Sequence, residues 1–373
     1  MGRGGLFVYE SSKLRSAAEE MLGLEMPFGS LVRYAAKSNP HHDIVRLFDK
    51  MGLHFDAAHP DEAAMLLDHG VEGSKISLSS QTLPMDEVLS RVIESGVRPV
   101  ATSLDQIAKL GRLGCVNIAV RPNTREPGSG HNNRTNTAGP SSPFGIWYER
   151  IPEALEMATQ RGMVIDRVHT HIGSGADPNS WPRAIAASLE IVEQLPDVTT
   201  ADMGGGYKIA RMPDETPTDM QWVGSIFANA VEAFADRTGR EISLELEPGT
   251  YLTGNAGTLI GRVEEKKSTS LYNFLILNTG MNAYLRSAIY GAQNDMEILN
   301  DAVEREWYLV FGNACESGDI LTPAERDPEG LKPRLLKKAE VGDYLAIRGA
   351  GAYGLTMAAV RYCHLPEATE VVV

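Results

Sequence analysis

Residues 53–70, LHFDAAHPDEAAMLLDHG, contain both kinds of element from which the fold is predicted to be built. The first four residues, LHFD, are a short apolar run of the kind that forms a buried strand. Residues 61–69 then place apolar side chains at helical spacing, and Gly70 follows where helices commonly end. This stretch therefore predicts one strand followed by one helix.

The same alternation continues on both sides of this stretch, from about residue 14 to about residue 257. It predicts parallel strands joined by helices, because such strands need a long crossover connection. Eight strand-like runs predict an α/β fold with a closed, TIM-like (β/α)8 barrel. The other seven runs are 31–35, 75–78, 99–101, 117–120, 164–169, 198–202 and 242–246.

The pattern changes after about Gly257, where helical periodicity largely disappears. Strand-like segments follow at 261–265, 274–277, 307–311 and 343–347, and a further strand is expected at 6–9. We therefore expect a barrel at 13–257 and a second, C-terminal β domain at 258–373 that also includes 1–12. Loops are expected at 125–143, beside the active site, and at 211–218, since both are rich in Gly, Pro, Asn, Thr or Asp.

The composition argues against several kinds of partner. The 373 residues are 43% hydrophobic and carry a formal net charge of -14, which disfavours nucleic acid and anionic membranes, since both need a basic face. Cys115, Cys315 and Cys363 lack CxxC spacing, so neither a disulfide framework nor a zinc site is indicated. With no signal segment and no run of about 18 apolar residues, a cytoplasmic protein without a membrane segment is expected.

Residues that carry chemistry follow several of the predicted strands. Catalytic residues of such barrels lie at the carboxyl ends of the strands, which is where Lys37 is expected. Most lysines are nevertheless solvated surface groups. His169 and His171 alternate along a strand and would point to the same side. They are a weak metal signal without a third ligand, and an imidazole stacked on an aromatic cofactor explains them equally well.

Three consecutive glycines, Gly204, Gly205 and Gly206, follow another strand. Their backbone amides can approach an anion such as a phosphate, although most glycine clusters are tight turns. Glu247 ends the next strand, where it would either face water or keep a pyridine ring protonated.

Two segments of the second domain also carry reactive side chains. Cys315 lies with Glu316 and Asp319 in a turn bounded by glycines, which suggests proton transfer or nucleophilic chemistry. Residues 349–354, GAGAYG, present Tyr353 either functionally or as an incidental aromatic residue in a turn.

Together and in this order, the motifs resemble the fold-type III pyridoxal-phosphate (PLP) decarboxylases, which include ornithine, arginine and diaminopimelate decarboxylases. The resemblance extends over nearly the whole chain and is closest to the diaminopimelate decarboxylases. It implies an alanine-racemase-like barrel. The motifs that carry it are TNT (135–137), FGIWY (144–148), HTHIGSG (169–175), GGG (204–206), EPG (247–249), MN (281–282), Arg286, YG (290–291), CESGD (315–319) and GAYG (351–354).

The resemblance implies that PLP is bound to Lys37 as a Schiff base and that no metal is required. Within the cofactor site, it implies that His171 stacks on the pyridine ring with support from Asp56, while Glu247 pairs with the ring nitrogen. The remaining cofactor contacts that it implies are made by Ser174, Gly204, Gly205, Gly206, Gly249, Thr250 and Tyr353.

The implied reaction is decarboxylation of a small amino acid, with meso-diaminopimelate giving L-lysine. Cys315 would return a proton, and Arg286, Tyr290, Glu316 and Tyr353 would bind the substrate. The resemblance also implies a homodimer with shared sites, in which Cys315 and Glu316 serve the partner's Lys37.

The chain departs from the family pattern at Thr250, where relatives usually carry the arginine of an EPGR motif. In the family that arginine lies near the cofactor phosphate and the distal substrate group, so its loss removes a contact of roughly 1.5–3 kcal/mol. Pro143 and the segment RYCHLP (361–366) also differ from the usual residues. These departures leave open decarboxylation of lysine, ornithine, a carboxylated polyamine or a secondary-metabolite precursor. A regulatory homologue without activity is a further alternative.

Overall fold

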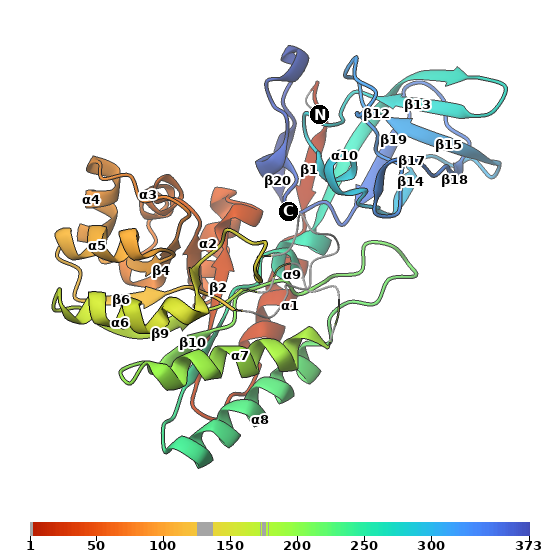
Figure 1. Ribbon diagram of the computed structural model, residues 1–373. Coiled ribbons are helices and arrows are strands. Elements are labelled where there is room, and N and C mark those ends of the chain that lie inside the picture. Colours follow the sequence, from red (N-terminus) through yellow and green to blue (C-terminus); the bar gives the residue numbers. More distant parts are fainter. Residues whose placement is uncertain (1–2, 125–136, 172, 174–176, 178) are drawn as a thin grey trace.

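The computed structural model describes residues 3–124, 137–171, 173, 177 and 179–373. Eight parallel strands close into a barrel in the order β10-β11-β2-β3-β4-β5-β6-β9, which confirms the predicted (β/α)8 fold (Figure 1). The barrel strands are β2 (Ser30–Ala35), β3 (His54–Ala57), β4 (Ile76–Ser79), β5 (Arg98–Ala101), β6 (Asn117–Val120), β9 (Val164–His169), β10 (Thr200–Asp202) and β11 (Ser243–Leu246).

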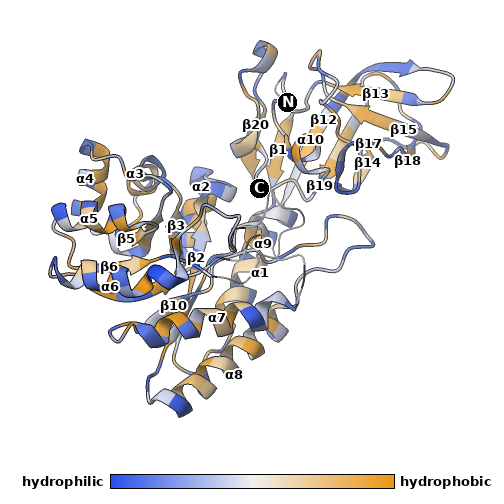
Figure 2. Cartoon of the chain, in the orientation of Figure 1, coloured by the Kyte–Doolittle hydropathy of each residue, from blue (hydrophilic) through white to orange (hydrophobic). Residues whose placement is uncertain are grey.

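Helices surround this barrel and bury their apolar faces against it. α8, for example, buries Val223, Phe227, Val231 and Phe234, which recur every three or four residues and so lie on one face. Figure 2 shows hydrophobic and hydrophilic residues alternating along α7 in the same way. The helices are α1 (Ser11–Leu22), α2 (His42–Lys50), α3 (Pro60–Asp68), α4 (Glu87–Glu94), α5 (Leu104–Arg112), α6 (Ile151–Thr159), α7 (Ser180–Gln194) and α8 (Met220–Thr238).

The βα unit at residues 53–70 shows why the sequence folds in this way. α3 begins at Pro60, where the missing N–H has no helical partner to lose. Asp61 and Glu62 lie in its first turn, where negative charge is favourable. The chain leaves the helix through Gly70, whose φ of +88° suits a residue without Cβ.

A separate eight-stranded sheet lies to one side of the barrel, at the upper right in Figure 1. Its main path is β14-β19-β12-β13-β15-β18, and β1 pairs with both β12 and β20. These strands are β1 (Leu6–Tyr9), β12 (Gly257–Ser268), β13 (Asn273–Leu277), β14 (Met296–Ile298), β15 (Arg305–Phe311), β18 (Arg334–Lys337), β19 (Tyr344–Arg348) and β20 (Thr369–Val372). Smaller elements are the strand pairs β7 (Pro122–Asn123) with β8 (Ile146–Trp147) and β16 (Pro323–Ala324) with β17 (Asp327–Leu331), and the helices α9 (Thr250–Thr253) and α10 (Arg286–Tyr290).

The sheet and the barrel are joined tightly beside Lys37. The backbone N–H of Tyr353 donates to the carbonyl of Ser38 at 2.7 Å, and the Asn39 side chain donates to the carbonyl of Gly351 at 3.0 Å. The backbones approach so closely that a Cβ at Gly351 would lie 2.0 Å from the carbonyl oxygen of Thr253, in α9. The loop that carries Tyr353 is therefore held against the turn that carries Lys37.

Within the described residues, every helix is too short or too polar to pass through a lipid bilayer.

Candidate active site

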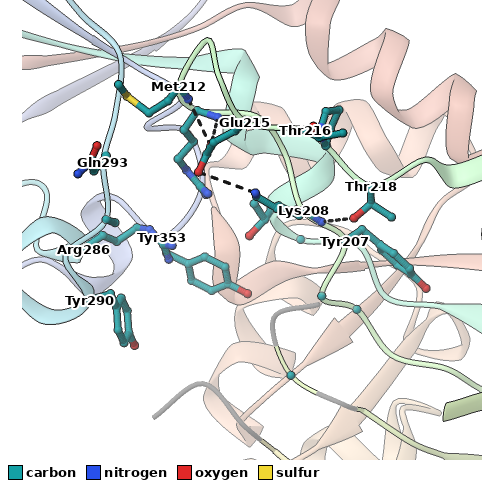
Figure 3. Close-up of a pocket in the computed structure, with 18 of the residues that line it drawn as sticks. Tyr207, Lys208, Met212, Glu215, Thr216, Thr218, Arg286, Tyr290, Gln293 and Tyr353 are labelled. Carbon is teal, nitrogen blue, oxygen red and sulfur yellow. Dashed lines mark hydrogen bonds and ion pairs between the residues drawn. The ribbon is translucent and has the colours of Figure 1, made fainter. Parts of the chain in front are cut away.

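A cavity of about 770 Å³ lies between the carboxyl ends of the barrel strands and the β sheet (Figure 3). Parallel strands all end on the same side of a barrel, so residues far apart in the sequence meet there. The cavity brings together most of the residues that the sequence indicated: Lys37, His171, Gly205, Gly206, Glu247, Gly249, Thr250, Arg286, Tyr290 and Tyr353.

Lys37 follows β2 in a short 3-10 turn, Ala36–Ser38. Its Nζ lies 3.7 Å from Oδ2 of Asp56, a buried residue of β3. Protein surrounds the lysine, yet 44% of its side chain is exposed because it faces the cavity. Burial lowers the pKa of Lys37, but the charges of Asp56, Tyr353 and Glu247 together outweigh burial and the net pKa is raised. The free amine is thus held in its protonated form.

This placement gives Asp56 a different partner from the one implied by the resemblance. The ion pair of Asp56 in the structure is with Lys37. His171 instead uses Nδ1 to accept a hydrogen bond from the backbone N–H of Gly205 at 3.0 Å. The neutral ring therefore carries its proton on Nε2. Burial, with Arg121 and Lys37 nearby, holds the pKa of His171 well below its usual value, so the ring is uncharged.

The three glycines form a cradle, and at the first two of them no side chain would fit. A Cβ at Gly204, where φ is +67°, would lie 2.5 Å from Nδ1 of His171. A Cβ at Gly205 would lie 2.2 Å from the carbonyl oxygen of Glu247. The chain can therefore pass between these two residues only without side chains, and the backbone at Gly206 lines the cavity where an anion could approach it. The N–H groups of Gly204 and Gly205 already donate to Oδ1 of Asp202, at 2.9 Å, and to His171.

Glu247 is 5% exposed, and its Oε1 has no hydrogen-bond partner among the described residues. Its Oε2 lies 3.1 Å from Nε2 of His169, whose pKa is lowered to about 4 by burial. Burial, and then the Asp56 carboxylate, raise the pKa of Glu247 to about 8. A buried carboxyl group with a free oxygen fits a protonated ring nitrogen. Together with the glycine cradle for a phosphate, it fits the group implied by the resemblance.

A layer of charged residues lies deeper in the barrel. Arg33 donates to both oxygens of Glu245 at 2.8 Å, and Arg167 donates to Oε2 of the same residue at 2.5 Å. These two guanidinium groups hold the pKa of Glu245 well below its usual range despite its burial. Arg167 also lies 3.6 Å from Oδ2 of Asp202. Arg167 and Glu245 come two residues before His169 and Glu247 along β9 and β11, so this charged layer fixes the part of the barrel directly beneath them.

His169, Asp202 and Glu247 place possible ligand atoms within 4.8 Å of one another, a grouping that sequence spacing did not indicate. The two acids come from β10 and from the end of β11, so only the barrel brings them to His169. The guanidinium of Arg167 already contributes positive charge to Asp202, and its repulsion disfavours a divalent cation there.

The β sheet contributes Arg286, Tyr290 and Tyr353 to the cavity, as Figure 3 shows. The guanidinium of Arg286 lies 5.6 Å from the ring centre of Tyr290 and 5.8 Å from that of Tyr353. Tyr353 has a φ of 54°, a left-handed conformation that is uncommon for a residue with a side chain. The two rings hold Arg286 at the cavity wall by cation–π contact.

Cys315 and Glu316 lie outside the lining of this cavity. Cys315 is exposed, and Glu316 accepts a hydrogen bond from the Tyr362 hydroxyl at 2.9 Å. Their turn is fixed by buried Asp319, which accepts backbone hydrogen bonds from Met281 at 2.6 Å and Ala314 at 2.9 Å. The fold of one chain thus does not bring Cys315 to Lys37.

Some indicated residues lie outside the part of the chain that the structure describes. These are Ser174 and the first two residues of the TNT motif, Thr135 and Asn136. The third residue of the motif, Thr137, donates its hydroxyl to the carbonyl of His171 at 2.8 Å.

Two arginines near the cavity were missed by the sequence reasoning. Arg121 follows β6 and lies close enough to Glu247, Asp56 and Asp202 for their charges to act on it. Its position directly after a strand-like run was a usable signal, as it was for Lys37. Arg211 lines the cavity from the loop after β10, and its sequence context gave no signal.

The chain is similar to known proteins over nearly its whole length. Residues 12–254 match the family model described as "Pyridoxal-dependent decarboxylase, pyridoxal binding domain". The diaminopimelate decarboxylase of Escherichia coli K12 is 30% identical, with 91% of this chain and 83% of the relative covered. That of Methanothermobacter thermautotrophicus is 31% identical, with 92% and 79% covered.

Solved structures of diaminopimelate decarboxylases are also similar to this chain. A crystal structure of a diaminopimelate decarboxylase matches with a TM-score of 0.87 and 27% identity, covering 96% of this chain and 86% of the other. The diaminopimelate decarboxylase of M. jannaschii in complex with L-lysine also matches with a TM-score of 0.87, at 25% identity, with 99% and 87% covered.

Proposed function

Because the chain belongs to the pyridoxal-dependent decarboxylase family, we propose that it removes one carboxylate from meso-diaminopimelate to give L-lysine, a step of lysine biosynthesis. The observation that supports this substrate is Arg286, which faces the cavity without an acidic partner among the described residues. An arginine in this position favours a substrate with a carboxylate at its far end over a plain diamine.

PLP supplies an electron sink for the pair released when the carbon–carbon bond to the leaving carboxylate breaks. Lys37 would hold the cofactor covalently, beside the Asp56 carboxylate. Glu247 would keep the proton on the ring nitrogen, and uncharged His171 would lie against the ring. The absence of side chains at Gly204, Gly205 and Gly206 would let the phosphate approach the backbone, where the Gly206 amide would bind it together with Ser174.

Cys315 and Glu316 would complete the site of a second copy of the chain. Both are placed away from the cavity of their own chain, on a turn that Asp319 fixes. In this proposal the barrel at 13–257 holds the cofactor. The β domain at 258–373, with 1–12, contributes residues to its own site and to that of its partner. The enzyme would be a homodimer in the cytoplasm, where the three free cysteines suit a reducing environment.

Release of carbon dioxide from a panel of amino acids tests the substrate. We expect meso-diaminopimelate to be turned over at least about ten-fold faster than lysine or ornithine, since neither brings a second carboxylate to Arg286. Faster turnover of lysine or ornithine would contradict this substrate and leave the cofactor assignment intact. It would favour the second candidate, decarboxylation of another amino acid, for which Thr250 in place of the usual arginine is the supporting observation.

Mixing two defective variants tests the shared site. Lys37→Ala lacks the cofactor anchor, and Cys315→Ala is expected to slow product formation while keeping the visible cofactor band. After exchange of subunits in an equal mixture, half of the dimers would hold one complete site, so about a quarter of wild-type activity should return. A mixture no more active than the mean of its parts would show that Cys315 does not act in the partner's site.

A further inference from the structure

Two arginines line the cavity close to each other. Arg211 comes from the loop after β10, and Arg286 begins α10 on the other side of the cavity. Figure 3 shows Arg286 and Tyr353 on the side away from Lys208 and Thr218. Burial first and the Arg286 charge next lower the pKa of Arg211 to about 10, which indicates that the two cations repel each other.

Among the described residues, neither guanidinium is in direct contact with a carboxylate. Among the described residues, no ion pair involves Arg211 or Arg286, and Nη2 of Arg211 and Nε of Arg286 are buried without hydrogen-bond partners. The Nε of Arg211 donates to the carbonyl of Gly349 at 3.2 Å. The Nε of Arg211 is thus held by the residue that follows β19. The Nη2 at the opposite end of the guanidinium has no hydrogen-bond partner among the described residues.

The nearest acid, Glu215, is engaged elsewhere. Its Oε2 accepts the backbone N–H groups of Arg211 at 2.7 Å and Met212 at 3.3 Å, and its Oε1 lies 3.9 Å from Nζ of Lys208. Glu215 therefore holds the loop together and leaves the Arg211 guanidinium without a direct carboxylate contact.

The loop presents Arg211 in a fixed position. The backbone N–H of Lys208 donates to Oγ1 of Thr218 at 2.7 Å, and the backbone N–H of Thr218 donates to the carbonyl of Lys208 at 2.9 Å. The carbonyl of Arg211 accepts from the N–H of Asp295, beside β14, at 3.0 Å. Fixing the backbone in advance reduces the entropy lost when a ligand binds.

In the barrel interior, two neighbouring buried arginines, Arg33 and Arg167, share the carboxylate of Glu245, which contacts both. Arg211 and Arg286 are half-buried, and no carboxylate of the described residues contacts both of them. Thr250, in the same cavity wall, brings no charge. Two cations are held together at low cost when an anion lies between them.

We propose that Arg211 and Arg286 form a two-arginine site for a single oxyanion group of a bound ligand. The identity of that group rests on the proposed function. It is either the distal carboxylate of the substrate or the phosphate of the cofactor. Both present oxygens that paired guanidinium donors match in geometry and charge. Arg211 is then a binding residue, and where the group is the distal carboxylate it helps to determine which amino acid is held.

Two matched ligands test the carboxylate as the source. L-lysine is what remains of meso-diaminopimelate after decarboxylation and keeps the distal carboxylate, whereas 1,5-diaminopentane is the same chain without it. We expect Arg211→Gln to weaken binding of L-lysine to the PLP-loaded enzyme by on the order of ten-fold to a hundred-fold. Binding of 1,5-diaminopentane should stay within about two-fold. Arg211→Lys, which keeps the charge but not the planar pair of donors, should recover part of the loss.

The phosphate as the source predicts a different result. The dissociation constant of PLP from the full chain would then rise by about ten-fold or more in Arg211→Gln, while the preference for L-lysine over 1,5-diaminopentane would stay unchanged. Arg326→Gln is the control, because Arg326 also lines the cavity but already lies 3.6 Å from Glu325. It should leave both measurements unchanged.

The proposal is overturned if Arg211→Gln changes neither the ligand preference nor the PLP dissociation constant. It is also overturned if L-lysine and 1,5-diaminopentane weaken equally while PLP binding is unchanged. All these measurements are of binding. A protein that releases no carbon dioxide from meso-diaminopimelate, but loses its preference for L-lysine in Arg211→Gln, would refute the proposed function and keep the site.

Discussion

Lys37→Ala is expected to lower kcat on the order of a thousand-fold or more and to remove the visible absorption band of bound PLP. Lys37 is the residue whose amine faces the cavity within 3.7 Å of a buried carboxylate. Without that amine the cofactor has no covalent anchor, and the substrate cannot displace one. The measurements are carbon dioxide release and the absorption spectrum before and after treatment with borohydride, which should bleach the wild-type band irreversibly.

Lys332→Ala is the matched control for this experiment. It removes a lysine from the lining of the same cavity, one whose Nζ contacts only the Gln293 side chain, at 3.5 Å, among the described residues. We expect its spectrum and turnover to stay close to those of the wild type. A borohydride-sensitive band that persists in Lys37→Ala would show that another residue anchors the cofactor. Absence of any band in the loaded wild-type protein would contradict the proposed use of PLP.

Glu247→Gln is expected to lower kcat by about a hundred-fold while changing KM less. The carboxyl group is buried, and its free Oε1 is available to hold a proton on the ring nitrogen. An amide has no negative charge to favour that proton, so the ring becomes a weaker electron acceptor. Glu325→Gln, at another carboxyl group in the cavity lining, is the control and should keep the wild-type rate. A wild-type kcat in Glu247→Gln would remove this residue from the mechanism.

The same variant should change how stability depends on pH. The pKa of Glu247 in the folded, cofactor-free protein is about 8, above its ordinary value of 4.5. Its contribution to the free energy of unfolding is therefore full below pH 4.5 and is lost as the pH rises through about 8. The Tm of the cofactor-free wild type should fall over this range more than that of Glu247→Gln, measured by thermal unfolding. Parallel curves would show that Glu247 titrates normally.

The sequence predicted the barrel because each strand and helix is specified locally. The run at 53–56 and the helical spacing at 61–69 became β3 and α3 with shifts of one residue. The start of the helix shifted because Pro60, rather than Asp61, takes its first position. Once parallel strands close a barrel, Lys37, His171 and Glu247 must meet, since all follow strand ends.

What the sequence could not predict depends on contacts between distant segments. Asp56 was expected beside His171, and only the packing of β2 against β3 shows that it contacts Lys37. Arg211 lies in an irregular loop, where no periodicity indicates which side chains point inward. Its direction is set by Glu215 and by a hydrogen bond to Gly349, from another part of the chain. The fold of one chain leaves Cys315 outside the cavity, so its role depends on the proposed dimer.

The close contact between the β sheet and the barrel beside Lys37 affects how ligands enter and leave the cavity. Tyr353 is hydrogen-bonded to Ser38, next to Lys37, and Gly351 lies too close to Thr253 to admit a side chain. Swinging the sheet away from the barrel would therefore pull on the lysine turn itself. We expect the two halves to move as one rigid body on the timescale of turnover. Substrate and product would pass through the mouth bounded by residues 211–218, so the rate of exchange would depend on that rim.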